Sequence, residues 1–367
     1  MNIQAAVAVG PGQPFALKAL TLEAPRPDEV VVEIHAVGIC HTDLVFRDAG
    51  VIAAPAVLGH EGAGVVVAVG TDVTKVRAGD RVILTFRSCG HCHRCDGGDA
   101  AYCETMPMLN YAGMRPDGTT TLSDEGARVS SNFFGQSSFA SHAITYERNL
   151  VKVPDGLPLE LMCTLGCGVQ TGAGGVMRSL KCEAGSSLLV TGGGPVGLSA
   201  VMGARLQGCG TVILVEPHAS RRALALELGA THVIDPAEAG DVAAAVRAIL
   251  PQGVDYAFDT TGLPAVQSAS LGALASKGVL GIVGVSAPGT PVPGDVNLLV
   301  TFGHTIKGII EGDSDPDLFL PELMAHFAAG RLPVDRLVTT YAFADINDAI
   351  AAQHRGECVK AVLVTAR

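Results

Sequence analysis

Hydrophobic and polar positions follow two different patterns along the chain, and the change falls near residue 186. Before it, β-branched runs at 31–39 and 63–70, and an apolar run after a Gly-Asp turn in 76–84, predict a β-rich region. After it, near-continuous apolar strands alternate with amphipathic helical patterns, which is typical of a parallel sheet covered on both faces. The strands of this second region are predicted at 187–191, 211–215, 254–258, 279–285 and 304–310, and two of its helices at 219–230 and 241–250.

Two further segments have patterns of their own. Residues 104–138 are polar and contain glycine without a sustained period, which predicts a long loop. Beyond about residue 311 the pattern becomes helical and closes on a strand at 360–366. A chain of 367 residues exceeds the usual size of one hydrophobic core, so two domains are expected.

Composition and charge narrow the classes of function. Forty-eight per cent hydrophobic residues indicate a well-buried globular protein. The 25 basic and 36 acidic residues give a net charge of −11 without a basic tract, so neither nucleic acid nor a membrane is expected as a partner. The N-terminus lacks a basic segment and breaks early at Gly and Pro, unlike a signal peptide, so a cytoplasmic location is expected. Ten cysteines stay reduced in that compartment, which indicates metal binding rather than disulfides.

Four cysteines lie in one short segment at the spacing C-x2-C-x2-C-x7-C. Four thiolates so close together complete a tetrahedron around zinc without an open position for substrate, which predicts a structural zinc lobe at about 87–105. An iron–sulfur cluster is the alternative, but the proline that follows the fourth cysteine in bacterial ferredoxins is missing. The four predicted ligands are Cys89, Cys92, Cys95 and Cys103.

A glycine-rich turn at 192–197 follows a predicted strand and opens a helix. Its G-x-G-x-x-G spacing lets the backbone approach a pyrophosphate, whose charge the helix N-terminus stabilises. The next strand leads to Glu216, whose carboxylate can hold the two hydroxyls of the adenosine ribose and would repel a 2′-phosphate, so NAD is favoured over NADP. Arg221 is expected to reach the same ribose, and Arg222 to be a solvated helix residue.

Residues 59–73, GHEGAGVVVAVGTDV, match the signature G-H-E-x2-G-x5-G-x2-V of zinc-dependent medium-chain alcohol dehydrogenases. With GICHTD at 38–43, the four-cysteine lobe, GCGVQTG at 166–172 and the glycine turn, the resemblance covers essentially the whole chain. The stretch GIIEGDSDP at 308–316 and the C-terminal RGECVKAVLV look most like the aryl (benzyl) alcohol dehydrogenase branch.

The resemblance implies an α/β architecture of two domains. A β-rich GroES-like catalytic domain would span 1–168 and 311–367, and a doubly wound Rossmann domain with a parallel sheet would span 169–310. Three family ligands of a catalytic zinc match this chain and would leave a fourth position open for water or alcohol. These are Cys40, His60 and Cys167, while Cys163, Cys182, Cys209 and Cys358 are expected to be buried core thiols.

Side chains near these ligands match family positions with roles of their own. Glu61 resembles a transient zinc ligand, and Asp43 would accept the other imidazole N–H of His60 and fix its tautomer. Thr42 matches the Ser or Thr that takes the hydroxyl proton and passes it to the nicotinamide ribose, while a hydride passes to NAD. Val45 stands where many relatives have a relay His, so ordered water is expected to carry the proton out.

Cofactor and substrate are expected to contact residues of both domains. A mostly apolar substrate pocket suits benzylic or allylic primary alcohols, and the residues expected to line it are Val45, Val51, Thr85, Asn110 and Val285. His41 and Lys360 match positions that face the pyrophosphate. The full set of expected cofactor contacts is His41, Thr171, Gly192, Gly194, Pro195, Val196, Gly197, Glu216, Arg221, Val283, Val285 and Lys360.

Several alternatives stay open at this point. Two are enzymes of the same family: a polyol or secondary-alcohol dehydrogenase, and a glutathione-dependent formaldehyde dehydrogenase, for which no obvious cationic pocket residue is present. A catalytically silent zinc- and NAD-binding protein is the non-enzyme alternative, and the intact ligands with Thr42 argue against it. The expected cofactors are two zinc ions per chain and NAD, with a small alcohol or aldehyde as the substrate. The length of 104–138 favours a homodimer over a homotetramer, paired through the apolar sheet edge near 295–310.

Overall fold

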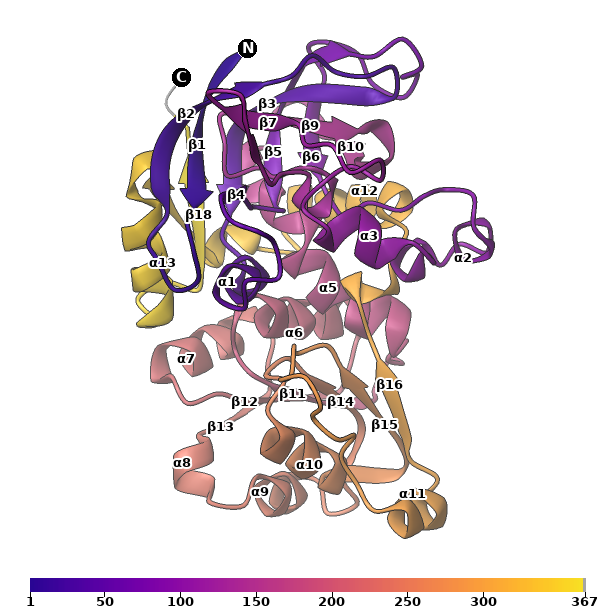
Figure 1. Cartoon of the computed structure of the whole chain (residues 1–367). Helices are drawn as coiled ribbons and strands as arrows, with labels where there is room; N and C mark the ends of the chain where they lie inside the picture. Colours follow the sequence, from indigo (N-terminus) through magenta and orange to yellow (C-terminus); the bar gives the residue numbers. More distant parts are fainter. Residues whose placement is uncertain (366–367) are drawn as a thin grey trace. The chain divides into compact units, whose positions relative to one another are not determined.

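The computed structural model describes residues 1–365, which form two compact units (Figure 1). The first unit comprises Met1–Cys167, Asp315–Ala329 and the described residues from Val334 onward. The second unit comprises Gly168–Ser314 and Gly330–Pro333. No helix among the described residues is long and apolar enough to cross a membrane.

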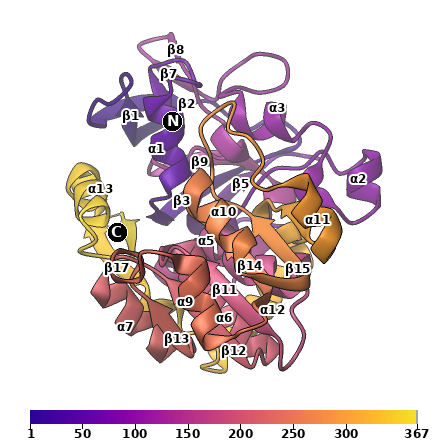
Figure 2. The same ribbon diagram turned by 90° about the horizontal axis from the view of Figure 1, so that it is seen from below.

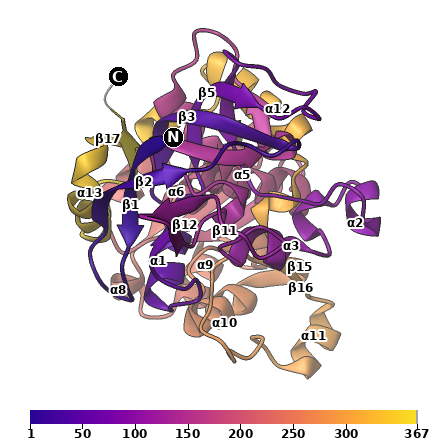
Figure 3. The same cartoon turned by 45° about the horizontal axis from the view of Figure 1, so that its top comes forward.

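The first unit is built on two β-sheets. The five-stranded sheet is antiparallel throughout, in the order β4-β1-β2-β7-β8. The seven-stranded sheet has the order β10-β6-β5-β3-β18-β17, with β9 also paired to β3, and only β17 and β18 run parallel in it. In Figure 3 the paired strands β1 and β2 lie beside each other near the N-terminus. The strands are β1 Asn2–Ala8, β2 Ala16–Leu22, β3 Glu29–Gly38, β4 Ala56–Val57, β5 Gly62–Val69, β6 Arg81–Leu84, β7 Leu122–Asp124, β8 Ala127–Val129, β9 His142–Tyr146, β10 Leu150–Lys152, β17 Val338–Ala342 and β18 Lys360–Val364.

Short helices connect these strands or pack on them. The β-branched run of β3 is buried almost throughout, because β5 and β9 pair with it and helix α4 packs on it. Helix α1 begins directly after β3, and this junction supplies part of the site described below. The helices of this unit are α1 His41–Asp48, α2 His93–Asp96, α3 Met106–Tyr111, α4 Leu159–Met162, α12 Pro316–Ala328 and α13 Ile346–His354.

Residues 104–138 are not the continuous loop that their sequence pattern predicts. They contain α3, β7 and β8, and a buried ion pair anchors the chain between α3 and β7. There the Arg115 guanidinium donates to both carboxylate oxygens of Glu29, at 2.6 and 2.9 Å, and Arg115 is only 1% exposed. The prediction of a loop was wrong because some of the buried side chains here are polar. A search for periodic hydrophobic residues does not detect buried polar side chains.

The second unit holds six parallel strands in the order β13-β12-β11-β14-β15-β16. Numbered along the chain this is 3-2-1-4-5-6, the strand order of the Rossmann fold. Helices α6 and α7 lie on one side of the sheet and α9 and α10 on the other (Figure 1), and Figure 2 views the unit from the side of α9 and α10. The elements are α5 Gly168–Gly174, β11 Ser187–Thr191, α6 Pro195–Gln207, β12 Thr211–Val215, α7 Ala219–Leu228, β13 His232–Ile234, α8 Pro236–Ala239, α9 Val242–Ile249, β14 Val254–Asp259, α10 Pro264–Gly272, β15 Leu274–Ile282, α11 Val296–Phe302 and β16 Thr305–Gly308.

This topology fixes where the second unit binds a ligand. Strand β11 is the first strand in sequence, with β12 on one side and β14 on the other, so the strand order reverses beside it. In open α/β sheets, ligands bind beyond the carboxyl ends of the strands at such a switch point. The glycine turn at 192–197 lies at that point, directly after β11.

Candidate active site

Four side chains that can bind a metal converge in the first unit. Cys40 precedes α1, His60 and Glu61 precede β5, and Cys167 ends the short helical turn at 163–166. One potential ligand atom from each lies within 4.8 Å of the others. His60, Glu61 and Cys167 are buried, and Cys40 is half-buried. Two thiols and an imidazole with one further position form the donor set of a catalytic zinc site.

The His60 ring is oriented for a metal. Its Nδ1 donates to the Asp43 carboxylate at 2.8 Å, and both side chains are fully buried. Its Nε2 is also buried, yet it has no hydrogen-bond partner within residues 1–365. Burial alone would lower the pKa of His60, but the Asp43 carboxylate and Cys40 hold this pKa well above its ordinary value. An orphaned ring nitrogen beside two thiols fits a zinc ion, because zinc would satisfy it.

The surroundings of Cys40 favour the thiolate form of its side chain. A hydrogen bond from the Cys167 side chain is the main cause that holds the pKa of Cys40 well below its ordinary value, with a contribution from His60. Since thiolates are the form that binds zinc, this lowering favours metal binding.

Asp43 organises the site beyond its bond to His60. One carboxylate oxygen also accepts from Gly59 N at 3.0 Å, and the other accepts from Cys40 N at 3.0 Å. Asp43 therefore fixes the backbone next to two metal-binding side chains and the ring of one of them.

Glu61 is paired with the buried ammonium group of Lys360. Lys360 Nζ lies 2.7 Å from the Glu61 carboxylate and donates to Ile39 O at 2.9 Å. Burial raises the pKa of Glu61, and the charge of Lys360 opposes this. A Cβ atom at Gly38 would collide with the ends of both side chains, so a larger residue there would have to displace them. The expected pyrophosphate contact of Lys360 stays a prediction, since Glu61 and Ile39 account for its position.

Two residues that position His60 carry no sequence signal. The Phe134 ring stacks on the His60 ring, with centroids 4.3 Å apart at 20°. Gln136 Nε2 donates to His60 O at 2.9 Å, and its Oε1 accepts from Gly62 N at 3.2 Å. Both lie in the segment predicted to be a loop, where neither period nor motif marks them.

The residues expected to line the substrate pocket differ in how far they are buried. Val45 is half-buried on α1, and Val51 is 59% exposed. Thr85 and Asn110 are fully buried, and their place in the pocket lining stays a prediction. The Thr85 hydroxyl donates to Gly166 O at 2.7 Å, and the Asn110 amide bonds to the backbone of the zinc lobe and of α3. These bonds join both side chains to backbone groups of the first unit.

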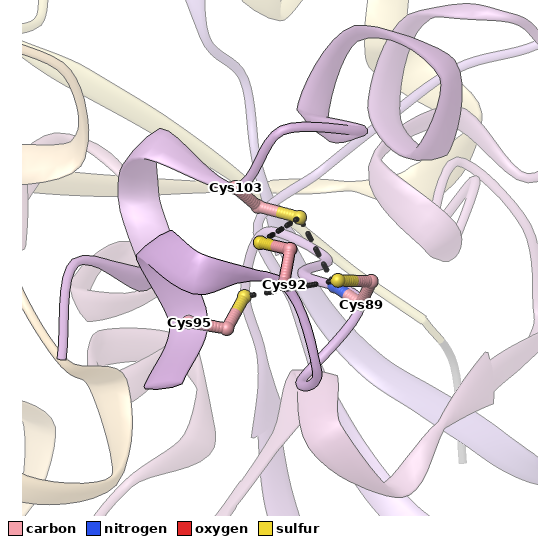
Figure 4. Close-up of side chains that lie close together, drawn as sticks. All are labelled: Cys89, Cys92, Cys95 and Cys103. Atoms are coloured by element: carbon pink, nitrogen blue, oxygen red, sulfur yellow. Dashed lines mark hydrogen bonds between the residues drawn. The ribbon is translucent and has the colours of Figure 1, made fainter. Parts of the chain in front are cut away.

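The four cysteines of the lobe form a second metal site (Figure 4). The sulfur of Cys89 lies 3.9 Å from that of Cys95, and the sulfur of Cys92 lies 4.0 Å from that of Cys103. A tetrahedron with Zn–S bonds of about 2.3 Å has edges of about 3.8 Å. Backbone hydrogen bonds from Glu104 and Cys95 lower the pKa of Cys92 to about 6, which favours its thiolate. The site fits a structural zinc with all four positions taken.

Each of the three glycines in the turn of the second unit has a property that dinucleotide binding requires. Gly192 has a φ of 93°, which favours glycine, and a Cβ atom at Gly197 would collide with Gly192 O. At Gly194, which precedes α6, a Cβ atom would meet nothing within 4 Å. These are the tight turn, the close helix–strand packing and the open approach that a pyrophosphate needs. Pro195 and Val196 form the first turn of α6 directly after it.

Glu216 lies at the expected place, directly after β12. Its carboxylate accepts from Gly193 N at 2.6 Å and from His218 N at 2.9 Å, so it faces the glycine turn. Arg221 is half-buried on α7. Arg222 is not the solvated residue predicted, because its guanidinium donates to Glu216 O at 2.8 Å and pairs with Asp235 at 2.9 Å.

Other expected cofactor residues differ in exposure. Thr171 is buried on α5, and its hydroxyl lies 3.4 Å from the Glu311 carboxylate. Val283 is half-buried and Val285 is exposed, both just after β15. In the first unit, His41 is exposed at the start of α1, and Thr42 beside it is half-buried.

A Rossmann sheet with a dinucleotide turn, a three-ligand metal site and a closed four-thiolate site together define the class of zinc-dependent dehydrogenases. Comparison with known proteins agrees with this. Residues 26–155 match the family described as "Alcohol dehydrogenase GroES-like domain", and residues 195–328 match "Zinc-binding dehydrogenase". The chain therefore belongs to the zinc-dependent medium-chain alcohol dehydrogenase family, with a GroES-like and a Rossmann domain, and its cofactors are zinc and a nicotinamide dinucleotide.

Several known proteins are similar over the whole chain. The geraniol dehydrogenase of Castellaniella defragrans is 48% identical over 365 residues, which is 99% of this chain and 98% of that protein. The crystal structure of benzyl alcohol dehydrogenase from Acinetobacter calcoaceticus has a TM-score of 0.95 at 41% identity and covers 100% of both chains. An alcohol dehydrogenase zinc-binding domain protein from Burkholderia ambifaria has a TM-score of 0.97 at 50% identity, again over 100% of both chains.

Proposed function

We propose that this chain is an NAD-dependent zinc alcohol dehydrogenase that reversibly oxidises primary aryl or allylic alcohols to aldehydes. The observation that carries the proposal is the convergence of Cys40, His60 and Cys167, with the unpartnered Nε2 of His60 among them. Under this proposal the unit with the metal sites is the catalytic domain, with the boundaries 1–168 and 311–367, and 169–310 binds the dinucleotide.

The proposed roles of the side chains follow from their placement. Zinc supplies a Lewis acid, and NAD supplies the hydride acceptor. Cys40, His60 and Cys167 hold the metal, and Asp43 keeps the His60 ring in the tautomer that directs Nε2 toward it. Thr42, next to the first ligand on α1, takes the proton of the substrate hydroxyl.

The proposed substrate class rests on two relatives. Geraniol and benzyl alcohol both carry their hydroxyl on a primary carbon attached to an unsaturated carbon, and the relatives named for them align over essentially the whole chain. NAD is preferred in this proposal because the Glu216 carboxylate lies against the glycine turn, where it would repel a 2′-phosphate. A polyol, a secondary alcohol and S-(hydroxymethyl)glutathione are the competing substrates.

A substrate panel tests the proposal. Initial rates with NAD and NADP are measured for benzyl alcohol, geraniol, a polyol, a secondary alcohol and S-(hydroxymethyl)glutathione, together with zinc per chain. We expect two zinc ions per chain and the highest kcat/KM for benzyl alcohol or geraniol with NAD. A higher value for one of the other substrates would replace the proposed class. Two zinc ions and NAD binding without turnover of any alcohol would make the chain a silent binding protein.

Substitutions on α1 can test the path of the proton and the contact with the cofactor. We propose that ordered water carries the proton outward past Val45, so Val45→His should change the pH dependence of turnover, and an unchanged profile would contradict this route. The imidazole of His41 offers a pyrophosphate fewer hydrogen-bond donors than a guanidinium would. His41→Arg should therefore slow NADH dissociation in stopped-flow displacement, and an unchanged rate would contradict a contact there.

The proposed assembly is a cytoplasmic homodimer that pairs through the edge of the six-stranded sheet. Strand β16 is the last strand of the sheet, and the preceding helix α11 exposes a row of apolar side chains. Val296 is 73% exposed and Val300 is 78% exposed. Light scattering coupled to gel filtration should report twice the mass of the chain, and Val300→Asp should lower it; a tetramer or an unaffected mass would refute this edge as the dimer contact.

A further inference from the structure

Two cysteines of the second unit that bind neither metal lie at the same edge of its sheet. Cys182 precedes β11, and Cys209 precedes β12. Because β11 and β12 are parallel neighbours, with Ser187 paired to Thr211, the segments that lead into them are adjacent. This is the amino edge of the sheet, opposite the carboxyl edge that holds the glycine turn.

Hydrogen bonds hold the two segments together. Gly185 N donates to Gly208 O at 2.8 Å, and Gln207 Nε2 donates to Cys182 O at 3.0 Å. The backbone N–H of each cysteine is bonded as well, from Cys182 to Val176 O and from Cys209 to Ala204 O, each at 3.0 Å. The two thiols lie close enough for each to shift the pKa of the other. Because these bonds hold the two segments together, a disulfide between Cys182 and Cys209 would join neighbouring stretches of backbone.

The two thiols differ in exposure and in acidity. Cys182 is only 2% exposed, whereas Cys209 is half-buried and its sulfur also accepts from the Ser186 hydroxyl at 3.8 Å. The Cys182 side chain is the main cause that lowers the pKa of Cys209 to about 7, and the Cys209 side chain is the main cause that raises the pKa of Cys182. Cys209 is therefore both the more exposed and the more readily ionised thiol, which makes it the nucleophile of the pair.

A polar cavity borders the segment that follows Cys182. It has a volume of about 360 Å³, and its lining includes Glu183, Ser186, Asp255 and Lys277. Ser186 contributes both to the cavity wall and to the hydrogen bond with Cys209. Cys209 itself is half-buried, so it is the thiol of the pair that a small oxidant in the solvent can approach.

We propose that Cys182 and Cys209 form a reversible intramolecular disulfide when the protein meets a hydroperoxide. The Cys209 thiolate attacks the outer oxygen of hydrogen peroxide, which releases hydroxide and leaves a sulfenic acid on Cys209. The Cys182 thiol then attacks the Cys209 sulfur, the S–O bond breaks, and one water is released as the disulfide forms. A dithiol reductant reverses the reaction. This modification site is independent of the proposed alcohol oxidation.

The disulfide would have a structural consequence of its own. Cys209 lies directly beyond the end of α6, and α6 begins at the glycine turn. The bond would therefore tie the end of this helix to the segment before β11 and close the chain between residues 182 and 209. Closing such a loop restricts the unfolded chain, so the oxidised protein should unfold at a higher temperature than the reduced protein.

Peptide mapping of the zinc-loaded protein tests the proposal. The protein is treated with hydrogen peroxide in slight excess over chains, free thiols are blocked, and the digest is analysed by mass spectrometry while released zinc is followed with a chromogenic chelator. We expect a Cys182–Cys209 crosslinked peptide that dithiothreitol removes, formed before any zinc is released. Cys182→Ser should accumulate a sulfenic acid on Cys209 that dimedone traps, and Cys209→Ser should form no crosslink.

The controls separate this site from general oxidation. Cys358→Ala changes a buried cysteine outside both metal sites and should form the crosslink at the wild-type rate. The proposal is overturned if Cys209 stays reduced while zinc-binding cysteines are oxidised and zinc is released, or if either cysteine pairs with a different one. Should a serine variant fail to fold, the map of the wild-type protein alone decides between these results.

Discussion

Replacing Asp43 with asparagine would separate the orientation of His60 from the presence of the zinc ligands. The wild-type carboxylate accepts three N–H groups: His60 Nδ1 at 2.8 Å and Gly59 N at 3.0 Å on one oxygen, and Cys40 N at 3.0 Å on the other. The asparagine side chain can keep the first two bonds through its single oxygen, but its NH2 group then faces Cys40 N. The variant therefore loses one charge-assisted bond and the negative charge behind the imidazole, with almost no change in side-chain size.

The magnitude follows from what is lost. A buried N–H without an acceptor costs about 1–3 kcal/mol, and the loss of a residue that orients a metal ligand typically weakens zinc binding about 10–100-fold. Tenfold in affinity corresponds to about 1.4 kcal/mol, so the two estimates agree. We expect Asp43→Asn to bind the catalytic zinc about 10–100-fold more weakly than the wild type.

Competition with a chromogenic zinc chelator measures this affinity, and the chain supplies two controls. The four-cysteine site has no contact with Asp43, so its zinc should be retained by the variant. Asp48→Asn changes an exposed acid on the same helix and should leave both zinc ions in place. Equal affinities for Asp43→Asn and Asp48→Asn, or loss of both zinc ions from Asp43→Asn, would refute the orienting role.

Three further outcomes are expected. Glu29→Gln breaks the buried pair with Arg115 and should lower the free energy of unfolding by about 3 kcal/mol in guanidinium titrations; a loss below about 1 kcal/mol, as for an exposed pair, would contradict a buried ionic anchor. Cys103→Ser should lose one zinc ion by metal analysis and keep the other, whereas loss of both would mean that the sites are not separate. The rate of Cys209 alkylation should rise through a midpoint near pH 7, because its lowered pKa makes the thiolate abundant there, and denaturant should move the midpoint upward; a native midpoint above that of the unfolded chain would contradict the contact with Cys182.

Runs of apolar residues predicted the long strands of the second unit because these strands are largely buried on both faces. The run 211–215 coincides with β12, which is buried between two neighbouring strands. Strand β13 has only three residues, too few for a period to show, and was not predicted. Strand β17 was also not predicted, because residues 338–342 are exposed or half-buried. Pattern therefore finds strands that are long and buried, and misses short ones and those at an edge.

The site residues were predicted from motifs, whereas the strands were predicted from hydrophobic periodicity. Cys40 and His60 were predicted because they stand in motifs that resemble those of the family, and the structure brings their ligand atoms together. The backbone partners of Thr85 and Asn110 were not predicted, because they lie 81 and 23 residues away. Phe134 was missed for the same reason, since its contact with His60 bridges two remote segments. Tertiary contacts of this kind leave no periodic trace in the sequence.

The start of α1 explains why one short motif carries so much of the site. Asp43 accepts the N–H of Cys40, only three residues away, and this bond is local to the first turn of the helix. The same carboxylate holds the His60 ring, 17 residues away, so the turn that starts the helix also sets the position of the second ligand relative to the first. Two of the three ligands are therefore positioned by a helix start that needs no metal to form. Cys167 is the last residue of the first unit before the chain enters the second, so zinc binding adds a bond at that passage. Removal of the catalytic zinc should accordingly loosen the backbone near Cys167 more than that near Cys40, and hydrogen exchange of the two segments with and without zinc would measure the difference.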